Sequence, residues 1–251
     1  MGSTPSQQKH DKVAQTMKDL FSSQGLKYKT DFVLYNVPLD TIPGWLYTLE
    51  AGFNNKQTLV MVHGYGSNIA FFYQIIPLLA QHFHIYAFDM YGMGNSYRYN
   101  FDILKNTEQA LELYTKSIEE WRIKLGLDNF YILGHSLGGY LTNHYLHRYN
   151  PKVHGVFMIS PAGIIKRNKK EFNKYIKEME SPKTGKKIGY VSRKFLTLML
   201  YLIQDRKWSP FSFLNVLPTN KALKGYFGSP RFNLPEKDKQ LLIDYYKSIL
   251  D

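Results

Sequence analysis

The motif Gly134-His135-Ser136-Leu137-Gly138 places a serine where it can do nucleophilic chemistry. It directly follows an apolar run at residues 130–133 and precedes a helical pattern, so the serine falls in a turn between a strand and a helix. A sharp turn of this kind exposes the hydroxyl, and flanking glycines let the backbone turn. We therefore predict that Ser136 is a nucleophile and that Gly134, His135 and Gly138 shape its turn. The alternative is an ordinary turn in which Ser136 only caps the helix.

A second motif, His63-Gly64-Tyr65-Gly66, ends another apolar run at residues 58–62. Loops of this type contribute one backbone N–H group to an oxyanion hole, and the residue after the nucleophile contributes the other. This pattern predicts that the oxyanion donors are the amides of Tyr65 and Leu137. We interpret His63, Gly64 and Gly66 as residues that shape the loop, with a general-base role for His63 as the alternative.

Strand-like and helix-like segments alternate along the chain. Two aromatic runs at residues 32–35 and 45–49, separated by prolines, are typical of antiparallel strands. Four continuous apolar runs, typical of strands buried on both faces, follow at residues 58–62, 84–88, 130–133 and 156–159. Helical patterns lie between them at residues 69–82, 107–125 and 138–149. The alternation predicts an α/β fold with a doubly wound, mostly parallel sheet and a site at the carboxyl ends of its strands.

Composition predicts three regions: a polar lead-in at residues 1–25, an α/β core at 26–164 and a basic helical cap at 165–251. In the last region helical patterns occur near residues 171–179, 192–204 and 236–250. Residues 1–160 contain 13 Lys+Arg and 12 Asp+Glu, a balance of +1, whereas residues 161–251 contain 19 and 8, a balance of +11. The net charge of +12 therefore belongs almost entirely to the cap.

The 251 residues are 44% hydrophobic and include no cysteine. This composition favours a folded domain and excludes disulfides, thiolate metal sites and a cysteine nucleophile, and we expect no cofactor and no metal. The longest apolar run, residues 195–203, is too short to span a bilayer, and the start of the chain lacks the apolar core of a secretory signal. We expect an intracellular protein. Gly2 and Ser6 match the N-myristoylation pattern, with a chance match as the alternative.

Taken in order, H-G-Y-G, F-D-M-Y-G-M-G-N-S, G-H-S-L-G-G and I-S-P-A-G resemble the α/β-hydrolase fold family. The closer resemblance is to the subgroup of lysophospholipid and N-acylphosphatidylethanolamine lipases and the lipid-droplet lipase co-activator. It implies a hydrolase of acyl esters in lipids that works at membranes or droplets. In the co-activator branch the nucleophile position is not serine, so Ser136 favours the hydrolase branch.

No histidine in the sequence is well placed to activate Ser136. His144 and His147 lie about 12 and 16 Å along the following helix, and His154 precedes its strand at the far end of the sheet. The family resemblance implies an acid and a histidine on loops after two later strands, and we expect this chain to lack those C-terminal strands. The spacing His84-x-x-x-x-Asp89 is acyltransferase-like, but it lies within a buried strand and we interpret it as coincidence.

Three interpretations of function remain open. The chain is a shortened form of a lipid-directed serine hydrolase with little activity of its own, or a protein that binds a lipid surface or a protein partner of unknown identity without efficient hydrolysis. The third, a nucleic-acid binder, rests on net charge alone, and no nucleic-acid motif accompanies it. For both lipid interpretations we expect the basic cap to contact an anionic membrane or lipid-droplet surface.

Overall fold

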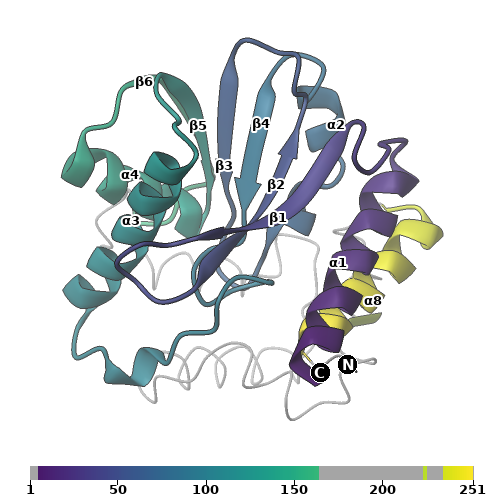
Figure 1. Ribbon diagram of the computed structural model, residues 1–251, viewed down its shortest axis with the longest axis horizontal. Coiled ribbons are helices and arrows are strands. Elements are labelled where there is room, and N and C mark those ends of the chain that lie inside the picture. Colours follow the sequence, from purple (N-terminus) through teal and green to yellow (C-terminus); the bar gives the residue numbers. More distant parts are fainter. Residues whose placement is uncertain (1–4, 164–222, 225–233, 251) are drawn as a thin grey trace, which may run out of the picture. The chain divides into compact units, whose positions relative to one another are not determined.

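The computed structural model describes residues 5–163, 223–224 and 234–250 (Figure 1). The chain divides into two compact units, Met1–Ala162 with Phe227–Asp251 and Gly163–Tyr226. Nearly all of the described residues belong to the first unit. Most of the predicted basic cap, including the helical patterns near residues 171–179 and 192–204, lies outside the described residues, and so does Gly2.

The first unit is built on a six-stranded sheet with strand order β1-β2-β4-β3-β5-β6. Strands β1 and β2 pair antiparallel, as do β2 and β4, whereas the pairs β3–β4, β3–β5 and β5–β6 are parallel. The strands are β1 (Phe32–Pro38), β2 (Trp45–Ala51), β3 (Thr58–Val62), β4 (His84–Phe88), β5 (Phe130–His135) and β6 (Val153–Ile159). The helices are α1 (Pro5–Ser23), η1 (Ile69–Phe72), α2 (Ile76–Leu79), η2 (Phe101–Ile103), α3 (Thr107–Lys124), α4 (Leu137–Tyr149) and α8 (Glu236–Leu250).

The predicted doubly wound, mostly parallel sheet is confirmed, and all six strands lie where the apolar runs place them. The predicted burial on both faces is wrong for β6, the last strand of the described sheet, in which Val156, Phe157 and Ile159 are 40%, 47% and 41% exposed. The helical pattern at residues 69–82 is broken into two short pieces, η1 and α2. Pro77 lies in the first turn of α2. A proline in a helix interior removes a backbone donor and clashes with the preceding turn, so a continuous helix through residue 77 is disfavoured. Sequence spacing alone does not separate one amphipathic helix from two short segments with the same buried face.

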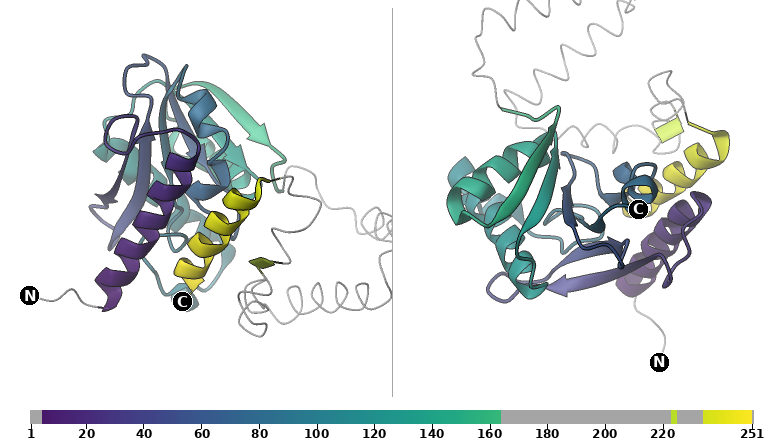
Figure 2. Two further views of the ribbon diagram at one scale, coloured as in Figure 1. Left: turned by 90° about the vertical axis from the view of Figure 1, so that its right-hand side faces the viewer. Right: turned by 90° about the horizontal axis from the view of Figure 1, so that it is seen from above.

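Helices α3 and α4 cover one face of the sheet (Figure 2). Trp121 of α3 is fully buried on this face, its ring centroid 4.6 Å from that of Phe88. Its indole N–H donates to the Thr48 hydroxyl of β2 at 2.9 Å, which satisfies the one polar group of a large core side chain. The contact fixes α3 against the centre of the sheet.

The polar lead-in predicted at residues 1–25 instead contains α1, which packs against α8 on the other face of the sheet (Figures 1 and 2). Four side chains of α1 are buried with helical spacing: Val13, Met17, Leu20 and Phe21. Each contributes about 1.5–3 kcal/mol of hydrophobic burial. The i, i+4, i+7, i+8 spacing was the signal for this helix, and the many polar residues between these positions obscured it. Because α8 belongs to the first unit, the structure also differs from the predicted grouping of residues 165–251 in one cap.

Asp238 of α8 joins three segments that are far apart in the sequence. Its side chain is buried, and Oδ2 accepts hydrogen bonds from the Tyr73 hydroxyl and from Nε2 of Gln24, both at 3.1 Å. Buried polar groups are tolerated when their hydrogen bonds are made, so these two bonds position α8 against both α1 and the segment after η1.

The first prediction concerns this buried carboxylate. We expect Asp238→Ala to lower the free energy of unfolding by about 1–3 kcal/mol, because the buried hydroxyl of Tyr73 and the half-buried amide of Gln24 lose their acceptor. Asp244→Ala is the matched control, since Asp244 is exposed on the same helix and, among the described residues, accepts only from Gln240. Urea denaturation measures both variants, and equal losses for the two would contradict the role of Asp238.

Candidate active site

Ser136 lies between β5 and α4 with a backbone conformation that few residues other than glycine adopt. Its backbone angles are φ 53° and ψ −117°, and its side chain makes no capping hydrogen bond to α4. Three backbone bonds hold it: its N–H donates to the Ile159 carbonyl at 3.0 Å, and its carbonyl accepts from the N–H groups of Ala162 at 2.9 Å and Tyr140 at 3.2 Å. A positive φ at a residue other than glycine costs about 1–3 kcal/mol. The strained turn is therefore held by the backbone on both sides, while the hydroxyl makes no hydrogen bond to the described residues.

The glycines around Ser136 are required for close packing. A Cβ atom at Gly138 would lie 2.3 Å from the carbonyl oxygen of His63, and one at Gly134 would lie 2.6 Å from the Cα atom of Gly139. Neither glycine has a positive φ. From the sequence we expected that these glycines free the backbone to turn, but Ser136 is the residue with the unusual φ. The glycines let α4 approach the ends of β3 and β5.

The loop after β3 lies directly beside Ser136. A Cβ atom at Gly64 would be 3.1 Å from Cβ of Ser136 and 3.0 Å from Nδ1 of His135. Gly66, in the same loop, has φ 66°. The Leu137 amide belongs to the first turn of α4, whose N–H groups have no partner within the helix. The structure thus brings the two segments that carry the predicted oxyanion donors, Tyr65 and Leu137, to the two sides of the serine.

His63 is fully buried, and both of its ring nitrogens are engaged. Nδ1 lies 2.8 Å from the Gly64 carbonyl oxygen, and Nε2 accepts a hydrogen bond from the Met90 N–H at 2.8 Å. An amide donor at Nε2 requires the neutral ring, with its proton on Nδ1. Burial lowers the pKa of His63 to about 4. This histidine braces the loop against the end of β4, and neither nitrogen is available as a base for Ser136.

Asp89 is a buried residue of the site edge to which the sequence argument assigned no role. Its two carboxylate oxygens accept from the backbone N–H groups of Ile69 and Asn95, each at 2.7 Å. A Cβ atom at Gly94, which has φ 54°, would lie 2.0 Å from Oδ2. Burial raises the pKa of Asp89 to about 7, and the two amide donors oppose that rise. Asp89 holds the start of η1 and the turn after β4 in place, and its position directly after a buried strand was the signal that could have revealed it.

Three of the other described histidines make contacts away from Ser136. The His144 ring packs on Tyr140 within α4. The His154 ring packs on Tyr131, which is near the start of β5 and about 16 Å along that strand from Ser136. His84, at the start of β4, lies 2.7 Å from a carboxylate oxygen of Glu50. Because Asp89 follows the far end of β4, His84 and Asp89 cannot act together, as expected for a coincidental spacing.

The surroundings of Ser136 are aromatic and partly open. The Phe71 ring stacks on His135 with a centroid separation of 4.4 Å, and Phe71 is 45% exposed. Tyr65 is 48% exposed. Within the described part of the chain no cluster of three or more potential metal ligands occurs, and no helix there is long and apolar enough to cross a membrane.

Comparison with protein families gives a match over residues 57–193 to the family described as alpha/beta hydrolase fold. The chain is 41% identical over 109 residues to a probable 1-acylglycerol-3-phosphate O-acyltransferase of Oryza sativa subsp. japonica, a match that covers 43% of this chain and 26% of the relative. It is 35% identical over 123 residues to the human 1-acylglycerol-3-phosphate O-acyltransferase ABHD5, covering 49% of this chain and 35% of that protein. The matches thus span only about a quarter to a third of these relatives.

Solved structures share the fold at low sequence identity. Naproxen esterase of Bacillus subtilis aligns with a TM-score of 0.55 and 16% identity over 99% of this chain and 68% of its own. A bacterial membrane phospholipase A aligns with a TM-score of 0.54 and 17% identity over 96% of this chain and 64% of its own. These likenesses support the fold alone.

The second prediction follows from the buried, neutral His63. The folded pKa of about 4 lies below the ordinary value of about 6.5, so the unfolded chain takes up this proton at higher pH than the folded chain does. The contribution of His63 to stability is therefore complete above about pH 6.5 and is lost as the pH falls toward 4. Relative to a His63→Gln variant, the free energy of unfolding should fall by up to about 1.4 kcal/mol per pH unit over that range.

Urea denaturation near pH 6.5, 5.5 and 4.5 measures this difference. Asp89, whose pKa is raised, makes the free energy of unfolding change with pH in the opposite direction. Its contribution is the same in the unaltered chain and in His63→Gln, so it cancels in the difference between them. His147→Gln is the control, because His147 is exposed on α4. A His63→Gln difference that does not change with pH would show that His63 is not held neutral by burial.

Proposed function

The chain belongs to the α/β-hydrolase fold family, and from this membership we propose that it acts on acyl esters of lipids with Ser136 as the nucleophile. The observation that carries the proposal is the backbone of Ser136, held at φ 53° between β5 and α4 with its hydroxyl unbonded by described residues. A capping serine would use its hydroxyl on the helix, and Ser136 does not. Strain of this kind is concentrated at functional sites.

In the proposed reaction Oγ of Ser136 attacks the ester carbonyl carbon while its proton passes to a base. The carbonyl oxygen becomes an oxyanion, which the backbone N–H groups of Tyr65 and Leu137 stabilise. Collapse of this intermediate breaks the bond to the alcohol. The alcohol takes up a proton and departs, and an acyl-serine ester remains. Attack by water then releases a carboxylic acid, and attack by another hydroxyl transfers the acyl group.

Two observations support a lipid substrate. Both named relatives are described as 1-acylglycerol-3-phosphate O-acyltransferases, proteins named for moving an acyl group onto a lipid precursor. In this chain the exposed rings of Phe71 and Tyr65 belong to the segments beside Ser136, where an acyl chain can bury apolar surface against them. We propose an acylglycerol or lysophospholipid ester as the substrate class.

The third prediction is that residues 1–251 hydrolyse esters slowly. No described histidine is hydrogen bonded to Ser136, and without its base a serine nucleophile retains only the roughly 10³–10⁴-fold rate enhancement that oxyanion stabilisation and binding provide. Hydrolysis of p-nitrophenyl butyrate measures the rate, and Ser136→Ala should keep most of it, because oxyanion stabilisation and binding do not need the serine hydroxyl. Added imidazole should raise the rate of the unaltered chain more than that of Ser136→Ala, because it replaces the base.

Turnover at ordinary enzyme rates without any response to imidazole would mean that Ser136 already has a base. A response to imidazole that is equally large in Ser136→Ala would remove Ser136 from the mechanism. Ser67→Ala is a suitable control, since Ser67 lies in the loop beside the site but is assigned no step in the reaction.

A second candidate function is binding of a lipid surface without efficient hydrolysis. It is favoured by the lack of a base bonded to Ser136 among the described residues, and by the balance of +11 in residues 161–251, with 19 Lys+Arg against 8 Asp+Glu. Clustered basic residues contribute about 1 kcal/mol each at an anionic membrane surface.

The fourth prediction tests this electrostatic binding. The chain should co-sediment with phosphatidylserine vesicles, and the bound fraction should fall as salt is raised from about 0.05 to 0.5 M, because salt screens surface charges. Vesicles of phosphatidylcholine alone are the control and should bind much less. Binding that is equal for both vesicles, or unaffected by salt, would contradict a role for the basic residues.

A further inference from the structure

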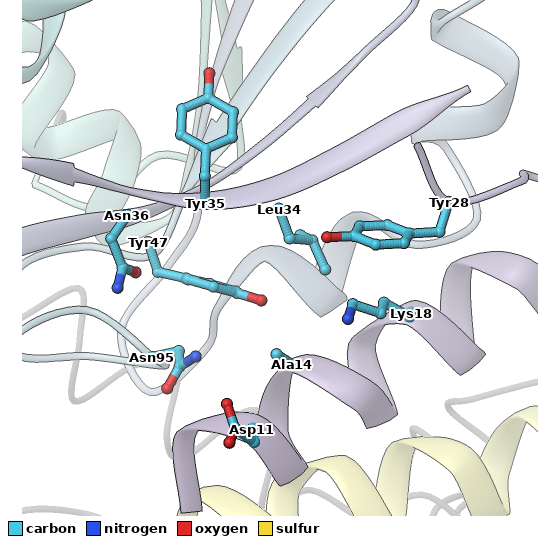
Figure 3. A pocket seen from close by; sticks show the side chains of 9 residues that line it. All are labelled: Asp11, Ala14, Lys18, Tyr28, Leu34, Tyr35, Asn36, Tyr47 and Asn95. Carbon is cyan, nitrogen blue, oxygen red and sulfur yellow. The ribbon is translucent and has the colours of Figure 1, made fainter. Parts of the chain in front are cut away.

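A pocket of about 230 Å³ lies between α1 and the first two strands of the sheet (Figure 3). Side chains of α1, β1 and β2 line it, together with the turn that encloses Asp89. None of the residues proposed for acyl chemistry, Ser136, Tyr65 or Leu137, is among them. The pocket is therefore a separate site.

The pocket contains a buried hydroxyl whose proton has no acceptor. Tyr47 is 4% exposed; its oxygen interacts with the side chain of Asn95, and its O–H group donates to none of the described residues. Figure 3 shows that this hydroxyl points into the pocket, across the space from Lys18 and Tyr28. Burial of a hydroxyl donor without an acceptor destabilises a protein, and such groups are rare in folded structures. A ligand that accepts a hydrogen bond from Tyr47 would recover this loss.

Two further donors share this part of the pocket. The Lys18 ammonium lies 4.4 Å from the centroid of the Tyr28 ring, a distance typical of a cation–π contact, which positions the charge. The Tyr28 hydroxyl points toward the same space (Figure 3). Two hydroxyl donors and one ammonium suit an anionic group such as a phosphate or a carboxylate.

The other end of the pocket has the opposite charge. Asp11 lies seven residues before Lys18 on α1, which places the two side chains on the same side of the helix and about 10 Å apart along its axis. Asp11 is exposed, so it lies at the open side of the pocket, and the amides of Asn36 and Asn95 complete the lining there. A carboxylate with amide groups suits an ammonium group that carries several N–H donors.

We propose that this pocket binds a small zwitterion, with its anionic group at Lys18, Tyr28 and Tyr47 and its ammonium group at Asp11. Separate positive and negative ends favour such a ligand over a simple anion or a simple cation, because each charge of the ligand meets its opposite. The molecule is either free in solution or the headgroup of a zwitterionic lipid, and both present the same chemistry to the pocket.

Isothermal titration of the chain with phosphoethanolamine, inorganic phosphate and ethanolamine tests the charge arrangement. Phosphoethanolamine should bind at least about tenfold more tightly than either single-charge probe, which corresponds to about 1.4 kcal/mol. Asp11→Asn should remove this preference and leave phosphate binding unchanged. Asp19→Asn is the matched control, because Asp19 is exposed on the same helix and does not line the pocket. Equal affinity for phosphate and phosphoethanolamine, or no binding of either, would overturn the proposal.

Substitution of the buried tyrosine separates ligand binding from folding. Tyr47→Phe should leave the free protein folded, because it removes a buried donor that has no acceptor, and should weaken phosphoethanolamine binding about tenfold. Tyr245→Phe is the matched control, since the Tyr245 hydroxyl is also buried without an acceptor among the described residues but does not line the pocket. It should stabilise the free protein and leave binding unchanged. Unchanged binding by Tyr47→Phe would contradict the assignment.

A vesicle assay distinguishes the two sources of the zwitterion. If the ligand is a lipid headgroup, Lys18→Met should reduce co-sedimentation with vesicles that contain phosphatidylethanolamine. If it is a free molecule, Lys18→Met should weaken only the binding of phosphoethanolamine. No effect in either assay overturns the proposal. Ser136→Ala should change neither result, so failure of the proposed acyl chemistry leaves this inference intact.

Discussion

The close contact between the first turn of α4 and the end of β3 determines the geometry of the candidate active site. At Gly138 the helix lies so near the strand that a Cβ atom would be 2.3 Å from the His63 carbonyl oxygen. This approach brings Ser136, at the start of the helix, beside Gly64, in the loop after the strand. The positions of the proposed nucleophile and of the loop that carries one proposed oxyanion donor thus depend on one packing contact. A side chain at residue 138 would displace α4 and separate them.

Two buried polar residues hold the loops around this contact. His63 links the loop after β3 to the end of β4 through the Met90 amide, and Asp89 links the end of β4 to the start of η1 through the Ile69 amide. Burial of each group is costly, as the lowered pKa of His63 and the raised pKa of Asp89 indicate. Buried polar groups are tolerated when all their hydrogen bonds are made, and a complete set of bonds restricts the loops to few conformations. These two residues therefore hold the backbone amides of the site in defined positions.

The sequence predicted the sheet and the turn at Ser136 because both depend on local patterns. Continuous apolar runs identified the strands, although they wrongly indicated that β6 is buried, and the motif at residues 134–138 identified the strand-to-helix turn. Contacts between distant segments were beyond the reach of such patterns. The sparse stripe of Val13, Met17, Leu20 and Phe21 did not identify α1 among many polar neighbours, and nothing local indicated that α8 would join it through Asp238. The close contact that requires glycine at residue 138 could not be predicted either, since its neighbour His63 is far away in the sequence.

A well-formed serine turn and a functioning catalyst have different requirements. The turn needs β3, β5, α4 and the backbone bonds from Ser136 to Ile159 and Ala162, all of which lie within residues 57–163. Catalysis also needs a base at Oγ, and the packing that positions the serine gives it none, because it commits both nitrogens of His63 to the loop. A chain can therefore retain the strain of about 1–3 kcal/mol at Ser136 whether or not it turns over substrate. The hydrogen bonds of the Ser136 hydroxyl, more than its backbone angles, distinguish a lipid hydrolase from a lipid-binding relative.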